Sequence, residues 1–127
     1  MRVLMTSACG VLALATLLPL GVAHAQTTSD TWPQFRGASR NGVAASVLPA
    51  ELTLKWTYEA DEAIDSSAAS VDGVVYVGTY AGTLIALDLE SGTERWTYST
   101  GVMGIGESSP AVAGGLVFIG DLGGVFH

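Results

Sequence analysis

Clustered carboxylates are the first residues of this chain whose types and spacing could do chemistry. Glu59, Asp61, Glu62 and Asp65 lie close together in sequence. Calcium binds through roughly six to eight oxygen atoms, so an acidic cluster is a natural candidate site. The spacing matches no calcium-binding loop, however, and the cluster lacks the glycine that gives such loops their sharp turn. We interpret it as a solvated connection between two strands.

The remaining side chains that could act as nucleophiles, bases or ligands are scattered. Glu107 stands beside Ser108-Ser109, but a single acid does not make a site. The Ser pair occurs earlier as Ser66-Ser67, and we expect both pairs to bond backbone groups rather than to act as nucleophiles. His127 is isolated in sequence, which gives no support to a zinc or haem site. We therefore predict no catalytic, cofactor-binding or metal-binding residues in this chain.

Two arginines, Arg36 and Arg40, flank Gly37 in a segment rich in turn-forming residues. They could bind an anion or a partner, or they could be structural residues stacked on Trp32 or Phe35. The structural interpretation is the favoured one. We expect the segment to be an ordered loop whose aromatic residues are tucked onto a larger body.

The N-terminus has the features of a secretory signal peptide. Met1-Arg2 is a short basic region, residues 11–20 are apolar, and Ala25 ends a small-x-small cleavage site before Gln26. The apolar run is shorter than the roughly 20 residues of a membrane span, which disfavours an anchor. The sequence thus predicts a signal-peptide helix over residues 1–25, cleaved between Ala25 and Gln26. Cys9, the one cysteine of the chain, would leave with it.

Charge narrows the range of partners. The chain has 5 basic and 12 acidic residues, and removal of Arg2 makes the balance more acidic still. Nucleic acids and anionic membrane surfaces are bound through Lys and Arg, so neither is an expected partner. We predict an exported, acidic protein, in the periplasm or in the extracellular medium, without a membrane span after cleavage.

A segment that occurs twice, 42 residues apart, organises the rest of the chain. Short runs of β-branched and apolar residues separate glycines that recur in register. Repeats of this length built from short strands are typical of β-propeller blades. The paired glycines are Gly73 with Gly115, Gly78 with Gly120 and Gly82 with Gly124.

The predicted organisation is all-β. Residues 26–52 form an N-terminal loop segment, and residues 53–127 form part of a β-propeller of four-stranded antiparallel blades. Within this part, Leu54–Tyr58 is expected to be an N-terminal closing strand, residues 66–99 one complete blade, and residues 108–127 the start of a second. Fewer than about three repeats are rarely stable alone, so we expect the protein to contain further blades.

One motif in the predicted blade resembles the tryptophan-docking motif of the PQQ-like (pyrroloquinoline-quinone-type) β-propeller repeat family. The side chains of its Asp and Ser can form hydrogen bonds with backbone groups of a turn, and its Gly can adopt a left-handed conformation. Its Trp offers a flat surface to an adjoining blade. Trp56 has the matching strand sequence without the upstream half of the motif. The motif residues are Ala86, Asp88, Ser91, Gly92 and Trp96.

The resemblance implies two classes of function. One is a non-catalytic, protein-binding or scaffolding propeller, similar to the subunit that assists outer-membrane protein assembly, with other envelope proteins as partners. The alternative is the N-terminal part of a quinoprotein dehydrogenase that oxidises alcohols or sugars with PQQ and calcium. The motif residues build the ring rather than a cofactor site, so the scaffold is the favoured reading.

Overall fold

The computed structural model describes residues 31–127 except 45 and 47. The predicted signal-peptide helix and its cleavage site at Ala25 and Gln26 lie outside the described residues, as does the beginning of the loop segment 26–52. In the described part, no helix has the length and apolar character needed to cross a membrane.

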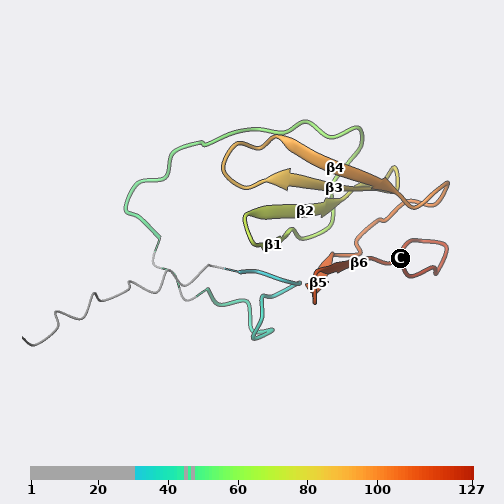
Figure 1. The fold of residues 1–127 in the computed structure, drawn as a ribbon, viewed down its shortest axis with the longest axis horizontal. Coiled ribbons are helices and arrows are strands. Elements are labelled where there is room, and N and C mark those ends of the chain that lie inside the picture. Colours follow the sequence, from blue (N-terminus) through green and yellow to red (C-terminus); the bar gives the residue numbers. More distant parts are fainter. Residues whose placement is uncertain (1–30, 45, 47) are drawn as a thin grey trace, which may run out of the picture.

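Four antiparallel strands form one sheet, which we call blade 1 (Figure 1). They are β1 (Ala69–Val71), β2 (Val74–Gly78), β3 (Thr83–Asp88) and β4 (Glu94–Ser99). Each strand pairs with the next in sequence, in the order β1-β2-β3-β4. Runs of Val, Ile, Leu and Tyr between short turns favour such a meander. The prediction of an all-β chain with a complete antiparallel blade is confirmed.

The turn between β1 and β2 shows why the strands reverse where they do. Asp72 and Gly73 have φ angles of 50° and 74°, both in the left-handed region. A two-residue hairpin of this kind needs positive φ at both central positions, and Asp-Gly is among the pairs that allow it. Asp72 and Gly73 therefore close a two-residue hairpin between β1 and β2.

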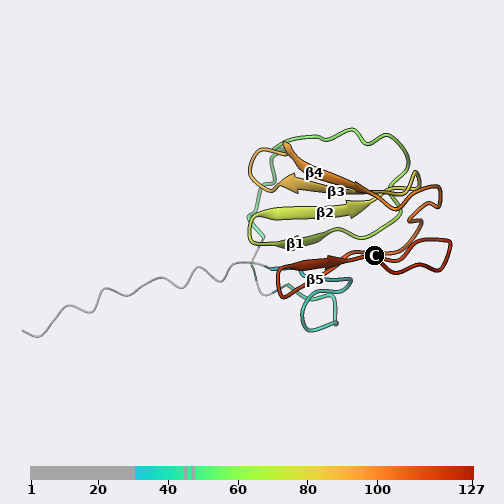
Figure 2. The same cartoon turned by 45° about the vertical axis from the view of Figure 1, so that its right-hand side comes forward.

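A second hairpin repeats the first two strands of blade 1, and we call it partial blade 2. It consists of β5 (Ala111–Ala113) and β6 (Leu116–Phe118), which pair antiparallel. An isolated bridge between Gly120 and Phe126 then repeats the pairing of Gly78 with Leu84 in blade 1. In both views the β5 hairpin lies beside the β1 side of blade 1 (Figures 1 and 2).

The buried core joins the two blades. Leu84 of β3, Ile105 of the inter-blade loop and Ile119 after β6 form one cluster, and Tyr76 and Val117 pack against it. Ile105 approaches so closely that a Cβ atom on Gly78 would lie 2.6 Å from its Cγ2 atom. A glycine at the end of β2 is thus what allows the inter-blade loop to pack on blade 1.

The structure corrects the prediction for the segment before blade 1. Leu54–Tyr58 is not a strand, although its apolar and polar residues alternate and Trp56 and Tyr58 are half-buried. Leu54 is 84% exposed. The segment contacts blade 1 through side chains, and alternation fixes side-chain direction without guaranteeing a backbone partner.

The N-terminal loop is also partly different from its prediction. Trp32 is anchored by an antiparallel bridge to Ser70 of β1, as expected for a tucked aromatic residue. Phe35, in contrast, is 59% exposed and does not pack into the body.

Candidate functional site

The turn between β3 and β4 is the most densely bonded part of the predicted motif. Asp88 accepts hydrogen bonds on Oδ1 from the backbone N–H of Glu90 and Ser91, at 3.0 and 2.9 Å, and from the Ser91 hydroxyl at 3.0 Å. Its Oδ2 atom pairs with the Arg95 guanidinium at 2.6 Å. The Arg95 contact, followed by the Ser91 contacts, holds the pKa of Asp88 well below its usual range. Asp88 is therefore a structural carboxylate committed to this turn.

Trp56 packs on that turn. A Cβ atom placed on Gly92 would lie 2.5 Å from Cδ2 of the Trp56 indole, so only glycine leaves room for the ring. The indole Nε1–H donates to the Leu89 carbonyl at 3.0 Å. The φ angle of Gly92 is 70°, which glycine adopts without strain. The structure thus brings Trp56 together with Asp88, Ser91 and Gly92.

Two polar contacts flank the Trp56 indole. Lys55 forms an exposed ion pair with Glu90, on the turn itself. The Tyr58 hydroxyl donates to Glu94 Oε2 at 2.7 Å. That hydrogen bond to a carboxylate favours the protonated phenol and raises the pKa of Tyr58. Together these contacts hold the segment before blade 1 against the β3–β4 turn.

Trp96 and Ala86 occupy a different place from the turn residues. They are partners across β3 and β4, and Ala86 is also the partner of Tyr76 on β2. The Trp96 ring lies 5.8 Å from the Tyr76 ring, and the residue is 39% exposed. Trp96 therefore covers one face of blade 1 while presenting much of its indole outward.

The serine pairs bond backbone groups, as the sequence predicted. The Ser66 hydroxyl accepts from the Gly78 N–H at 3.0 Å and donates to the Gly78 carbonyl at 3.1 Å. Ser108 accepts from the Gly120 N–H at 3.1 Å, which repeats the first of these contacts in partial blade 2. Ser109 accepts from the Ser67 N–H at 3.0 Å and so joins the two blades.

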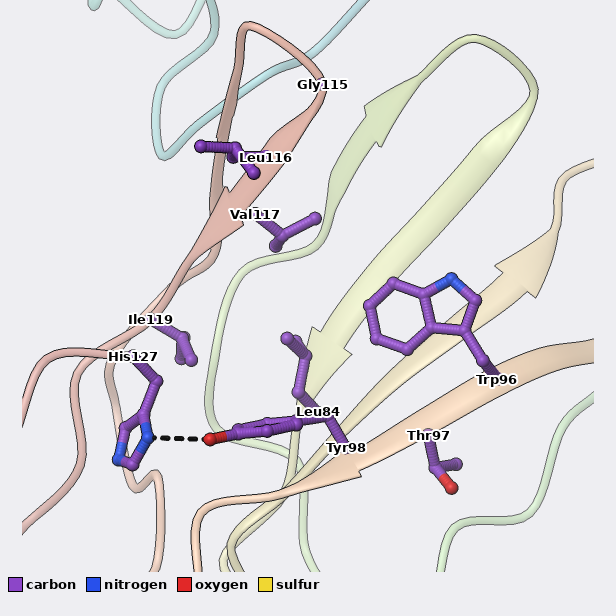
Figure 3. Close-up of a pocket in the computed structure, with 9 residues that line it drawn as sticks. All are labelled: Leu84, Trp96, Thr97, Tyr98, Gly115, Leu116, Val117, Ile119 and His127. Atoms are coloured by element: carbon purple, nitrogen blue, oxygen red, sulfur yellow. Dashed lines mark hydrogen bonds between the residues drawn. The ribbon is translucent and has the colours of Figure 1, made fainter.

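An open cavity of about 580 Å³ lies between β4 and partial blade 2 (Figure 3). The side chains of Trp96, Leu84 and Val117 reach toward the space between β4 and β6. Most of its wall is apolar. The lining residues are Leu84, Trp96, Thr97, Tyr98, Gly115, Leu116, Val117, Ile119 and His127.

At one end of this cavity three polar side chains form a hydrogen-bonded series. His127 Nδ1 lies 3.0 Å from the Tyr98 hydroxyl (Figure 3). Its Nε2 atom lies 3.0 Å from Asp121 Oδ2. The Asp121 side chain is 3% exposed and also accepts from the Val125 N–H at 2.9 Å. The His127 contact, and then the Val125 contact, lower the pKa of Asp121. This series ties β4 to partial blade 2.

The sequence-based view of His127 as an isolated residue is therefore wrong. Its partners lie 29 and 6 residues away, and no local motif connects them. The repeat carried the available signal, because it places His127 where blade 1 has the buried Ile85. A histidine at a position that is buried in the repeat needs hydrogen-bond partners for its ring nitrogens.

The acidic cluster stays dispersed, as a solvated connection would be. Glu59, Asp61, Glu62 and Asp65 are exposed, and Asp61 accepts a long hydrogen bond, 3.4 Å, from the Thr83 hydroxyl. Glu107 is exposed as well. Within residues 31–127, apart from 45 and 47, no three His, Cys, Asp or Glu side chains are grouped so that they could share a metal ion.

In the described part of the chain, neither loop arginine is stacked on Trp32 or Phe35, which differs from the favoured interpretation. The Trp32 ring packs on Gly37, where a Cβ atom would lie 2.9 Å from Cζ3 of the indole. The aromatic contacts found in the described part of the chain involve neither Arg36 nor Arg40. Both arginines are exposed.

Comparison with known families gives a match over residues 40–126, to the family described as outer membrane protein assembly factor BamB. Comparison with curated proteins gives no significant match. The matched region begins within the N-terminal loop and includes blade 1, the Trp56 contact and nearly all of partial blade 2. The chain therefore belongs to the PQQ-like repeat family of the outer membrane protein assembly factor BamB.

Proposed function

We propose that this protein is an exported β-propeller that binds or scaffolds other envelope proteins without catalysing a reaction, in the assembly of outer membrane proteins. The family match over residues 40–126 is the observation that carries the proposal. Polar side chains of blade 1 support it, because their hydrogen bonds and ion pairs are made to other groups of the fold. Asp88 is committed to Arg95 and its own turn, and Ser66 is committed to Gly78.

Export to the periplasm is part of this proposal. The basic Met1-Arg2, the apolar residues 11–20 and the cleavage pattern before Gln26 support it. A protein that assists outer membrane assembly must work in that compartment. N-terminal sequencing of the protein from the periplasmic fraction should begin at Gln26, and an uncleaved Met1 would contradict the proposal.

We also propose that further blades of the same protein cover the outward face of β4. Trp56 packs on the turn at Gly92, and Trp96 stands 40 residues later in a matching sequence with 39% of its surface exposed. The adjoining cavity has apolar walls from Leu84, Trp96 and Val117. A turn equivalent to residues 88–92 in the next blade would fit that indole as Gly92 fits Trp56.

A binding experiment on the full-length protein tests the proposed function. The purified protein should co-sediment with the outer membrane assembly machinery isolated from a strain that lacks this protein. A matched preparation of an unrelated outer membrane complex serves as the control. Association with neither preparation would contradict the scaffold role.

The dehydrogenase alternative is tested with the same preparation. Full-length protein incubated with PQQ and calcium should not reduce an electron-accepting dye when alcohols or sugars are added. Dye reduction that needs both PQQ and calcium would establish the enzyme instead. A rise in melting temperature with the two ligands would show binding independently of activity.

A further inference from the structure

The loop between residues 34 and 43 is a fixed structure at the surface. Its N-terminal end is held by two hydrogen bonds of 2.7 Å between the backbones of Trp32 and Ser70, and the Pro33 carbonyl accepts from Val112 of β5 at 2.8 Å. The loop thus contacts the first strand of both blades. It appears in cyan beside β5 in Figures 1 and 2.

Hydrogen bonds within the loop fix its backbone. The Gly37 N–H donates to the Gln34 carbonyl at 2.9 Å, and the Arg40 N–H donates to the Gly37 carbonyl at 3.1 Å. The Gly42 N–H closes the loop on the Arg36 carbonyl at 2.9 Å. Side chains carried by this loop are therefore presented in a defined arrangement.

Both arginines of the loop have left-handed backbone conformations. Arg36 has a φ of 64° and Arg40 a φ of 58°. This region is uncommon for residues other than Gly, Asn and Asp, and strained positions are concentrated at functional sites. The same loop uses glycine at two other left-handed positions, Gly37 and Gly42. The arginine side chains are thus present at positions where the backbone favours other residues.

The charges of these arginines are available to a partner. The described residues hold four Lys and Arg side chains, and two of them, Lys55 and Arg95, are paired with carboxylates. Arg36 and Arg40 form no ion pair with any residue in the described part of the chain. Their loop is the one unpaired cationic patch in that part of an otherwise acidic protein.

Apolar side chains are exposed on the same loop as the two arginines. Phe35 is 59% exposed and Val43 is 67% exposed. Arginine and aromatic residues together are typical of the energetically important parts of protein interfaces. The planar guanidinium group can bind a carboxylate through two parallel hydrogen bonds.

We propose that Phe35, Arg36, Arg40 and Val43 form a docking surface for an acidic stretch of a partner polypeptide that also carries an apolar side chain. This inference rests on the proposed scaffold function and specifies one surface for it. Carboxylates of the partner pair with the two guanidinium groups, and its apolar side chain covers Phe35. A short acidic stretch of polypeptide fits better than an anionic membrane, because it can contact the loop alone, whereas an extended membrane surface would also face and repel the acidic remainder of the protein.

Fluorescence anisotropy with the full-length protein tests the proposal. The probe is a short fluorescein-labelled peptide rich in Glu with one Phe, and the control peptide has Gln in place of every Glu. The protein variant is Arg36→Asn/Arg40→Asn, since Asn tolerates left-handed φ better than Arg does. Lys55→Gln, which removes an exposed cation elsewhere, is the matched control.

The expected result is binding of the Glu peptide that weakens roughly tenfold or more in the double variant and not in Lys55→Gln, because charge-assisted hydrogen bonds are lost. The Gln peptide should bind weakly to all proteins. The melting temperature of the double variant should equal or exceed that of the wild type. A lowered melting temperature would show that the arginines serve the fold, and would overturn the proposal.

Two further outcomes would overturn it. One is equal affinity of the wild type and the double variant for the Glu peptide, or no binding by either. The other is arginine-dependent binding to phosphatidylglycerol vesicles without peptide binding, which would make the surface a lipid site. If the protein still co-sediments with the assembly machinery in either case, this inference fails while the proposed function stands.

Discussion

At the residue scale, Asp88 and Gly92 give the turn between β3 and β4 a shape that Trp56 can cover. Asp88 bonds the backbone N–H groups of Glu90 and Ser91, and Gly92 leaves the space that the indole fills. The Asp, Ser and Gly of the motif could be interpreted as turn residues from sequence. Their contact with an indole 36 residues earlier could not, because it depends on how the preceding segment crosses the blade.

Gly92→Ala should destabilise the protein by about 1–3 kcal/mol, because a methyl group would clash with Trp56 and its φ of 70° is strained for alanine. Gly73→Ala is the matched control, since Gly73 has a φ of 74° and nothing within 4 Å of its added Cβ atom. Urea unfolding followed by tryptophan fluorescence measures both. Equal losses in the two variants would show that the Trp56 contact contributes nothing.

The stabilising contribution of Asp88 to the folded protein should be lost in acid. Its pKa is lowered by Arg95 in the folded state, so its contribution is complete above the unfolded value of about 3.9 and is lost as the pH falls toward the folded value. Asp88→Asn should therefore be less stable than the wild type at neutral pH, and the gap should narrow below about pH 4. Urea unfolding at several pH values measures the gap. A gap that stays constant with pH would argue against the Arg95–Asp88 interaction.

At the element scale, the strands of blade 1 followed from local sequence, whereas the pairing of more distant segments did not. The Asp72-Gly73 turn and the β-branched runs on each side of it are local signals, and they are enough to indicate the hairpin of β1 and β2. Leu54–Tyr58 alternates apolar and polar residues as a half-buried strand does, but it gains no backbone partner. The contact between His127 and Tyr98 joins residues far apart in sequence and left no local pattern.

Ser66→Ala tests whether the hydroxyl at the start of blade 1 stabilises the fold. The Ser66 hydroxyl bonds both backbone groups of Gly78, at the end of β2, and Gly78 is buried. Loss of the hydroxyl should cost about 1–3 kcal/mol, the range for a buried backbone group left without a partner. Ser39→Ala, in an exposed turn, should change stability by less than about 0.5 kcal/mol. Similar unfolding midpoints for both variants would contradict this role of Ser66.

At the scale of the whole molecule, a shared core and a cross-blade hydrogen bond join blade 1 to partial blade 2. Leu84, Ile105 and Ile119 form the shared core, and Ser109 bonds across the blades to Ser67. The repeat made this architecture predictable, because each blade reuses the same contacts. It could not identify a partner, since the exposed Arg36 and Arg40 lie in the loop segment outside the repeat.

Trp96→Ala tests whether further blades cover β4. In the full-length protein we expect a loss of roughly 3–5 kcal/mol, typical of truncating a buried tryptophan. Leu54→Ala, at a side chain that is 84% exposed, is the control and should change the stability of the same protein by less than about 0.5 kcal/mol. Denaturant unfolding of both variants makes the comparison. Losses of the same size would mean that no adjoining blade packs on Trp96.

Deletion of the gene is the most direct test of the scaffold role. The fraction of outer membrane barrel proteins that is folded can be measured by their altered electrophoretic mobility before and after heating. We expect a lower folded fraction in the deletion strain, restored by the wild-type gene on a plasmid. An unchanged folded fraction, together with a loss of PQQ- and calcium-dependent oxidation of alcohols or sugars, would contradict the scaffold role.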